Sequence, residues 1–348
     1  RPNFPLREMY SLIKNGWGED FIKFLNTKDI PLVTTFFTVA FMAEEHKFKN
    51  DIYLVLCDAD ISRSWVALNP QKSRIKYLAP CRRVVDRLKL YGVKNENIYL
   101  TGFPLPKELV GGASASTVKE DLARRICNLD PRGVFWEKYG ALLRTTLRSS
   151  CVRHKPQPVH LVLSIGGAGA QKARALEMVK SLREKIRRHK IRVTLVAGVR
   201  HDVARYFREG VRRAGIDARH RKGAEVLYRR TKEEYFEAFA KLLRTADVLW
   251  TKPSEMSFYT GLGMPVLMAP PIGSQEDFNR QWLTQVGGGV DALPASHISE
   301  WLFDWIDAGA LARMAWNGFV EAPTHGAYRI EQVLTGKPYE LETLPMII

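Results

Sequence analysis

The stretch that decides the fold is VHLVLSIGGAGAQKARALEMVKSLREKI, residues 159–186. Its first seven residues, 159–165, form a short and mostly apolar run, which is typical of a buried β-strand. Three glycines follow, and from about residue 171 apolar side chains recur at roughly helical spacing with lysines and arginines between them. The stretch therefore predicts a strand, a glycine turn and an α-helix in direct succession.

The glycine turn is a candidate anion site. Glycine adopts positive φ and lets a ligand approach the backbone closely, so Gly166, Gly167 and Gly169 suit such a role. The free N–H groups and the dipole of a helix N-terminus attract anions. The pattern is neither G-x-G-x-x-G nor a phosphate loop ending in Gly-Lys-Ser/Thr. On this stretch alone, a phosphate site and a plain strand-to-helix connection both remain open.

Strands and helices alternate over nearly the whole chain, which predicts an α/β protein with parallel sheets covered by helices on both faces. The predicted strands are 31–36, 52–57, 75–78, 98–100, 159–164, 192–196, 225–228, 248–251 and 266–269. The predicted helices between them include 82–91, 172–188, 203–213, 232–243 and 254–261.

A break between about 105 and 157 divides the chain. It holds the loop GGASAS (111–116), helical patterns and a polar, proline-bearing segment at 153–158. We therefore predict a first α/β domain over 1–106, a helical connecting segment over 107–157, a second α/β domain over 158–335 and a tail over 336–348.

The net charge of +16 favours an anionic partner: nucleic acid, an anionic membrane surface or a phosphorylated substrate. Much of the excess lies in amphipathic helices, as in 181–192, and a charged helix face is most often simply solvated. No zinc-finger spacing or RNA-binding aromatic motif accompanies the charge, which disfavours nucleic acid. The four cysteines are widely spaced and no H-E-x-x-H occurs, so we predict no metal site and a cytoplasmic location.

Several loops that follow the predicted strands carry an ordered set of motifs. In chain order they are Gly166-Gly167, Lys252-Pro253, Gly263-Met264-Pro265, Pro270 and Gln275-Glu276…Asn279. The set resembles the donor-binding half of two-domain glycosyltransferases of the GT-B fold, and is most similar to the monogalactosyldiacylglycerol synthase and peptidoglycan N-acetylglucosaminyltransferase family. The region from Pro31 to Thr101-Gly102-Phe103-Pro104 resembles the acceptor domain of the same enzymes.

The resemblance implies two Rossmann-like, doubly wound domains facing a cleft, with the acceptor on the first and a nucleotide-sugar on the second. It implies an inverting glycosyltransferase that uses a UDP-sugar without metal or cofactor, has a lipid as a candidate acceptor and is peripheral to a membrane. The implied nucleotide-sugar-binding residues are Gly166, Gly167, Gly169, Gln171, Lys252, Ser254, Glu255, Gln275, Glu276 and Asn279. An exposed lysine and a solvated helix N-terminus are the alternative explanations for Lys252 and for the Gln275-Glu276 pair.

This sequence departs from the family in two places. The family opens with a strand, a glycine-rich loop and a second strand–helix unit, whereas this chain begins with the helix pattern LREMYSLIKNGWGEDFIKFL. We therefore expect an incomplete first sheet with an exposed apolar edge, and the usual general base outside these residues. In addition, Phe258 occupies the place of the family's ribose-binding acid, and Glu255, one helical turn earlier, is the expected substitute.

Two carboxylates follow the predicted strand at 52–57 and are candidates for the general base that activates an acceptor hydroxyl. They are Asp58 and Asp60, for which a turn-forming role is the alternative. Two other functions also remain open: a UDP-sugar epimerase or hydrolase of the same fold, and a non-catalytic basic protein that binds nucleotides or nucleic acid through a degenerate site.

Overall fold

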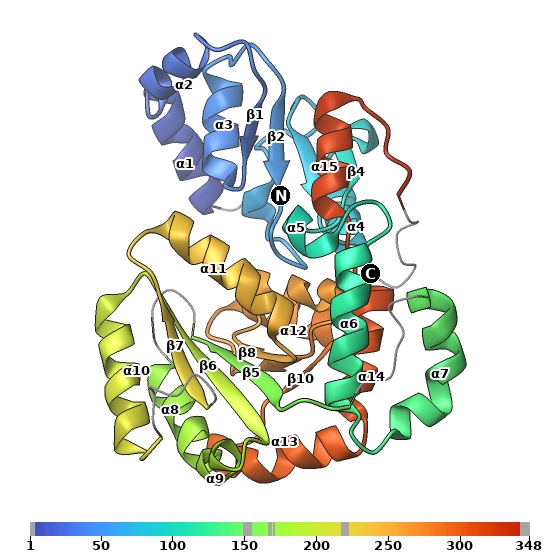
Figure 1. Cartoon of the computed structure of the whole chain (residues 1–348). Helices are drawn as coiled ribbons and strands as arrows, with labels where there is room; N and C mark the ends of the chain where they lie inside the picture. Colours follow the sequence, from blue (N-terminus) through green and yellow to red (C-terminus); the bar gives the residue numbers. More distant parts are fainter. Residues whose placement is uncertain (1–3, 149–154, 166–168, 170, 217–222, 342–348) are drawn as a thin grey trace. The chain divides into compact units, whose positions relative to one another are not determined.

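The computed structural model describes residues 4–148, 155–165, 169, 171–216 and 223–341. The chain forms two compact units (Figure 1). The first contains the described residues up to 105 together with 323–341, and the second contains residues 106–322. Each unit has its own sheet of parallel strands with helices packed against it, so the predicted α/β architecture with two Rossmann-like sheets is confirmed.

The first unit is built on four parallel strands in the order β1-β2-β3-β4. They are β1 (Leu32–Thr34), β2 (Ile52–Val55), β3 (Lys76–Ala79) and β4 (Ile98–Leu100). The helices before residue 105 are α1 (Phe4–Lys14), α2 (Glu19–Leu25), α3 (Phe37–Glu45), η1 (Arg63–Trp65), α4 (Arg82–Leu90) and η2 (Asn95–Asn97). Because the strand order follows the chain and such crossovers are right-handed, α3 and α4 cover the same face.

The other face of this sheet is covered by α15 (Gly326–Thr335), a helix from the far end of the chain. Ile330 packs against Tyr53 and Val55 of β2. The predicted second domain, 158–335, includes this helix, but its packing joins it to the first sheet. The apolar stripe of a helix shows that one face is buried without showing which sheet buries it.

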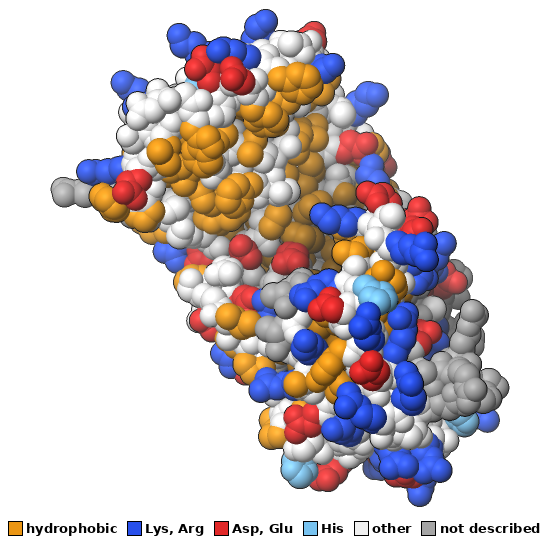
Figure 2. Space-filling model, turned by 90° about the vertical axis from the view of Figure 1, so that its left-hand side faces the viewer, with side chains coloured by type: hydrophobic (Ala, Val, Ile, Leu, Met, Phe, Trp, Pro, Cys, Tyr) orange, Lys and Arg blue, Asp and Glu red, His pale blue; other side chains and the backbone are white. Residues whose placement is uncertain are grey.

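Apolar side chains gather on the surface of the first unit (Figure 2). At the sheet edge, Ile30, Val33 and Phe36 are 62%, 44% and 53% exposed, and β1 pairs with β2 alone among the described strands. This exposed edge agrees with the expectation from the sequence. The remaining exposed apolar residues of this surface, on or beside α1 and α2, are Phe4, Leu12, Trp17, Phe21 and Phe24.

The second unit holds six parallel strands in the order β7-β6-β5-β8-β9-β10. They are β5 (Val159–Ser164), β6 (Ile191–Gly198), β7 (Ala224–Tyr228), β8 (Val248–Thr251), β9 (Val266–Met268) and β10 (Gly289–Asp291). From β5 the strands β6 and β7 follow in order toward one edge of the sheet. The chain then returns to the centre, and β8, β9 and β10 follow in order toward the other edge. This is the doubly wound order, and ligands bind beyond the carboxyl ends of the strands where the direction reverses. β5 and β8 are hydrogen-bonded neighbours, and we call the place beyond their carboxyl ends the switch point.

Helices cover both faces of this sheet. After the short α5 (Lys107–Val110), α6 (Ser116–Leu129) and α7 (Val134–Leu147) come before the sheet. Those within and after it are α8 (Lys172–Ser181), α9 (Arg183–Arg187), α10 (His201–Arg213), α11 (Lys232–Thr245), η4 (Glu255–Leu262), α12 (Ser274–Val286), η5 (Ala295–His297), α13 (Ile298–Asp307) and α14 (Ala310–Glu321). Figure 1 shows α8 and α10 on one face and α11 and α12 on the other, so all six residues of β5 are buried.

Three local features differ from the prediction. The expected helix over 172–188 is divided at Leu182 into α8 and α9. The expected helix over 254–261 is the 3₁₀-helix η4, which ends at Gly263 with φ 65°. The strand β10 was not predicted, because Gly289 to Asp291 lacks an apolar run and becomes a strand only by pairing with β9.

Candidate functional site

The carboxyl ends of β5 and β8 flank the switch point, and the predicted glycine turn follows β5. Within that turn, Gly166 and Gly167 lie outside the described residues, whereas Gly169 is described and has φ 68°. A Cβ atom at Gly169 would lie 3.2 Å from Nη1 of Arg200. The left-handed backbone and this close neighbour both favour glycine at the position.

Arg200 is a candidate site residue that was not predicted from the sequence. It follows β6, the strand next to β5, and its guanidinium group lies beside Gly169. Its Nη2 is 2.9 Å from Oδ2 of Asp202, and hydrogen bonding from Arg200 lowers the pKa of the Asp202 carboxyl. The signal was present in the loop AGVRHD (197–202), where an arginine comes two residues after a strand end.

Lys252 and Glu276 form an ion pair on the other side of the switch point. Lys252 follows β8, and its side chain is 21% exposed; Glu276 lies in the first turn of α12 with its side chain 7% exposed. The second carboxylate oxygen of Glu276 accepts a hydrogen bond of 2.8 Å from the backbone N–H of Ile272. The structure thus brings together two of the predicted residues and holds both oxygens of Glu276.

Gln171 joins the glycine turn to the loop after β9. Its Nε2 donates a hydrogen bond of 3.3 Å to the carbonyl oxygen of Pro270. Its Oε1 is buried, and within the described part of the chain it has no hydrogen-bond partner. A buried acceptor without a partner is costly, so this atom is suited to receive a ligand's hydroxyl or amide group.

The start of η4 carries the expected substitute for the ribose-binding acid. Glu255 is exposed, and Ser254, just before it, is half-buried. Burial first, and then the negative charges of Glu255 and Glu108, raise the pKa of Tyr259 to about 12. Phe258 is 2% exposed and its ring centroid lies 4.6 Å from that of Trp282. Phe258 is therefore a core residue.

The two remaining predicted residues of α12 differ in accessibility. Gln275 is exposed, and its side-chain amide lies over Gly273, where a Cβ would meet it at 2.8 Å. Asn279 has no exposed surface. A direct ligand contact is therefore open to Gln275, whereas one by Asn279 requires α12 to shift.

The two candidate bases of the first unit have different surroundings. Asp60 is 3% exposed and accepts hydrogen bonds of 2.8–2.9 Å from Arg83, Arg87 and the N–H of Ile61. Burial raises the pKa of its carboxyl, but the hydrogen bonds from Arg87 and Arg83 outweigh burial and hold it below the ordinary value. A general base needs a lone pair that can take a proton, and those of Asp60 are engaged. Asp58 is half-buried in the loop that follows β2.

Replacing Asp60 with asparagine should destabilise the first unit at neutral pH. The change removes the counter-charge of two arginine side chains that are 33% and 31% exposed, so we expect a loss of about 2–3 kcal/mol, below the value for a fully buried pair. Because the pKa is lower in the folded state, this stabilisation is present above the unfolded pKa of about 3.9 and disappears as the pH falls through the folded value.

Urea unfolding at pH 7 and near pH 3 measures both effects. The exposed Asp86→Asn variant on the same helix as the two arginines is the control, with an expected change within about 0.5 kcal/mol. An Asp60→Asn variant as stable as wild type at pH 7 would show that the ion pair does not stabilise the unit.

Groups of three or more His, Cys, Asp or Glu side chains that could hold a metal ion do not occur among the described residues. Within the same part of the chain, no helix is long and apolar enough to cross a membrane.

Comparison with known proteins gives one family match and many structural matches. A family model described as "Domain of unknown function (DUF6938)" matches residues 145–227, from the end of α7 through β7. No curated protein sequence matches the chain.

Among solved structures, UDP-GlcNAc 2-epimerase from Neisseria meningitidis bound to UDP-GlcNAc has a TM-score of 0.52 at 10% identity; the match covers 97% of this chain and 84% of the epimerase. MnaA from S. aureus, in a co-structure with UDP, has a TM-score of 0.50 at 13% identity over 99% and 84% of the two chains. MurG from Acinetobacter baumannii has a TM-score of 0.48 at 13% identity over 92% and 76%. The first two likenesses show that the chain has the GT-B fold.

Proposed function

We propose that the chain is a UDP-sugar enzyme whose donor site lies at the switch point of the second sheet. The observation that carries the proposal is the placement of two cations, Arg200 and Lys252, on opposite sides of the glycine turn that contains Gly169. A diphosphate at this place would meet both cations and the N-terminus of α8. Gly166 and Gly167 belong to the proposed site as the remaining glycines of the turn.

The leading candidate reaction is transfer of the sugar to an acceptor with inversion. Breaking the bond between sugar and phosphate leaves charge on the UDP leaving group, which fixed cations and backbone N–H groups stabilise without a metal ion. Arg200 and Lys252 would receive that charge, while Gln171 and Gln275 would bind hydroxyl groups of the donor. We propose Asp58 as the general base, because Arg87 and Arg83 hold the pKa of the Asp60 carboxyl below its ordinary value and so make Asp60 the weaker base.

A UDP-sugar 2-epimerase is the second candidate. The solved epimerase of N. meningitidis, which shares the fold, contains UDP-GlcNAc, and the same cations would hold the UDP that leaves in such a reaction. The two candidate reactions use the same donor site. They differ in that only sugar transfer requires an acceptor.

Product analysis distinguishes these reactions. The chain is incubated with UDP-GlcNAc alone and with acceptors, and UDP, free sugar, epimerised UDP-sugar and glycosylated acceptor are separated. A transferase releases UDP only when an acceptor is present, whereas an epimerase forms the second UDP-sugar without one. If neither UDP nor a new sugar appears with UDP-GlcNAc or other UDP-sugars, the proposed activity is wrong.

The apolar surface of the first unit supports a lipid acceptor. Eight large apolar side chains, each at least 44% exposed, lie on or beside α1, α2 and β1, and exposed patches of this kind mark binding sites for proteins or membranes. We therefore include a membrane-peripheral location in the proposal, together with the cytoplasmic location that the spacing of the cysteines favours. Acceptors presented in lipid vesicles should give more product than the same head groups in solution. Equal amounts of product in the two experiments would contradict the proposed lipid acceptor and membrane-peripheral location.

Replacing Glu255 with glutamine tests the proposed ribose contact. A carboxylate that receives both ribose hydroxyls makes charge-assisted hydrogen bonds of roughly 1.5–3 kcal/mol each, so its loss should weaken UDP binding at least about tenfold. Binding of 2′-deoxy-UDP should fall less than binding of UDP, because the analogue keeps only one of the two hydroxyls that the carboxylate receives. If the variant still prefers UDP to the deoxy analogue as strongly as wild type does, Glu255 only complements the dipole of η4.

A further inference from the structure

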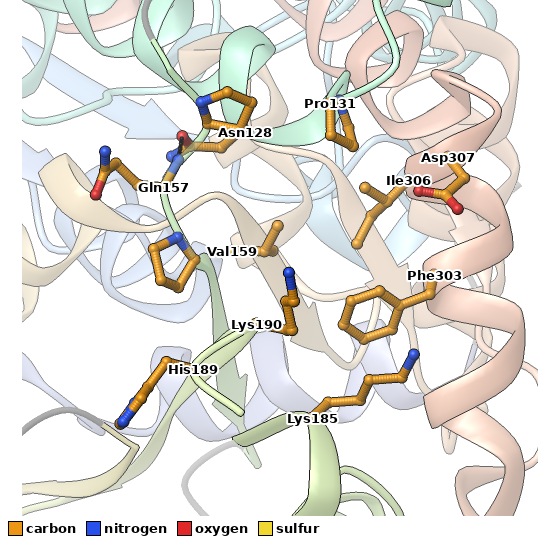
Figure 3. Close-up of a pocket in the computed structure, with 12 residues that line it drawn as sticks. Asn128, Pro131, Gln157, Val159, Lys185, His189, Lys190, Phe303, Ile306 and Asp307 are labelled. Atoms are coloured by element: carbon orange, nitrogen blue, oxygen red, sulfur yellow. Dashed lines mark hydrogen bonds between the residues drawn. The ribbon is translucent and has the colours of Figure 1, made fainter. Parts of the chain in front are cut away.

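A pocket of about 370 Å³ lies at the opposite end of the second sheet from the proposed donor site (Figure 3). It is formed where α6, α9 and α13 meet the start of β5. Val159, the first residue of β5, lies in its wall, whereas the glycine turn follows the last residue of that strand. At about 3.3 Å per residue, roughly 17 Å of strand separates the two places.

Apolar residues make up half of the lining of the pocket. Phe303 and Ile306 of α13 face Val159, and three prolines, Pro131, Pro156 and Pro158, complete the apolar lining. The volume is near the lower end of the range for small-molecule sites, roughly 300–1,000 Å³. The pocket therefore has room for one small ligand with an apolar body.

Two lysines supply the charge of the pocket. Nζ of Lys185 lies 4.2 Å from the ring centroid of Phe303. Figure 3 shows the side chain of Lys190 directed into the space between Val159 and Phe303, whereas the ring of His189 points away. The acid in the lining, Asp307, is already paired with Arg132 at 2.5 Å. The net charge offered to a ligand is positive.

The backbone holds the two lysines side by side. His189 has φ 52°, in the left-handed region, and the N–H of Lys190 donates a hydrogen bond of 2.9 Å to the carbonyl oxygen of Lys185. A left-handed residue with such a bond is the usual way of closing a helix C-terminus. The carbonyl oxygen of Lys190 in turn accepts from the N–H of Val159 at 3.3 Å. These bonds fix the backbone of the two lysines to the start of β5, and the side chains extend from it.

Two amide side chains line the pocket, those of Gln157 and Asn128. Gln157 is exposed, and its Nε2 donates to the carbonyl oxygen of Lys155 at 3.4 Å. The amide of Asn128 is engaged at both ends. Nδ2 of Asn128 donates to both carboxylate oxygens of Asp247, at 3.1 and 3.2 Å, and its Oδ1 accepts from the N–H of Gln157 at 2.9 Å. A neutral sugar needs several fixed acceptors and donors, which this lining does not offer. Charge and apolar contact are the interactions that remain.

We propose that this pocket binds a small organic anion: a single phosphate or carboxylate group on a flat apolar body. The anionic group lies between Lys185 and Lys190, and the apolar body lies on Phe303, Ile306 and the prolines. The site is independent of the proposed donor site, so the inference stands whether or not the chain uses UDP-sugars.

Calorimetric titration with 1-naphthyl phosphate tests the inference on the full chain. We expect saturable one-to-one binding, with inorganic phosphate and 1-naphthol each at least tenfold weaker because each lacks one of the two interactions. Removing both lysines in a Lys185→Ala/Lys190→Ala variant should weaken binding at least tenfold. The Lys180→Ala variant, which removes an exposed lysine of the preceding helix outside the pocket, is the matched control and should bind as wild type does.

Saturating UDP separates this site from the donor site. Affinity for 1-naphthyl phosphate should be unchanged in its presence, and a large decrease would place the ligand in the donor site and overturn the inference. No saturable binding up to millimolar concentration, equal binding of inorganic phosphate, or undiminished binding by the double variant would overturn it as well. Thermal unfolding of each variant verifies that the lysine changes leave the fold intact.

Discussion

Replacing Lys252 with alanine should weaken UDP binding by roughly 30-fold or more. A charge-assisted contact with the diphosphate contributes roughly 1.5–3 kcal/mol, and about 1.4 kcal/mol corresponds to a factor of ten. The ion pair with Glu276 adds to the effect, since that carboxylate is only 7% exposed and would be left without its counter-charge beside an anionic ligand. Calorimetry with UDP measures the change.

The partner of Lys252 provides a matched control. In a Lys252→Ala/Glu276→Gln variant the unpaired negative charge is gone, so affinity for UDP should recover in part relative to Lys252→Ala alone. Fluorescence of the buried Trp250 and Trp282 reports whether the second unit is folded in each variant. A folded Lys252→Ala variant that binds UDP within twofold of wild type would exclude Lys252 from the site.

Replacing Asp247 with alanine should destabilise the second unit by about 3 kcal/mol, the lower end of the range for removing one partner from a buried ion pair, because the Arg124 side chain is 33% exposed. Asp247 has no exposed surface, and its carboxylate accepts from Arg124 at 2.8 Å, from Asn128, and from the N–H of His160 at 2.9 Å. The change leaves these donors without their acceptor at the amino ends of β5 and β8. For a unit of this size the midpoint of thermal unfolding should fall by roughly 10 °C.

An exposed carboxylate of the same unit serves as the control for this prediction. Asp304→Ala on α13 should change the free energy of unfolding by no more than about 0.5 kcal/mol. Denaturant unfolding followed by tryptophan fluorescence compares the two variants. If Asp247→Ala is no more destabilised than Asp304→Ala, the network that fixes α6 to the sheet is not important for stability.

The sequence predicted the strands of the second sheet best where local pattern and burial agree. The run at 159–164 is apolar because β5 is buried on both faces, and its predicted bounds match those of β5. The order of the strands could not be predicted from periodicity, since nothing in the pattern of β8 shows that it pairs with β5. The same holds for α15, whose apolar face fits either sheet until Ile330 is seen against β2.

The candidate site residues that could be predicted are those with a recognisable local sequence pattern. Glycines between a strand and a helix, and a lysine before Pro253, carry a local signal, and the structure places Gly169 and Lys252 on neighbouring strand ends. Arg200 was missed because an arginine in a basic chain is inconspicuous until its contact with Gly169 is known. Asp60 illustrates the opposite case: the sequence shows an acid after a strand, and only the structure shows the two arginines that bind it.

Titration of the wild-type chain with UDP tests the central claim most directly. The account predicts saturable one-to-one binding that inorganic diphosphate competes for and that a short RNA does not displace, because the switch point offers Arg200 and Lys252 to one diphosphate group. If UDP produces no heat of binding up to millimolar concentration while the RNA binds, the chain is a basic nucleic-acid-binding protein with a GT-B fold, and the proposed donor site does not exist.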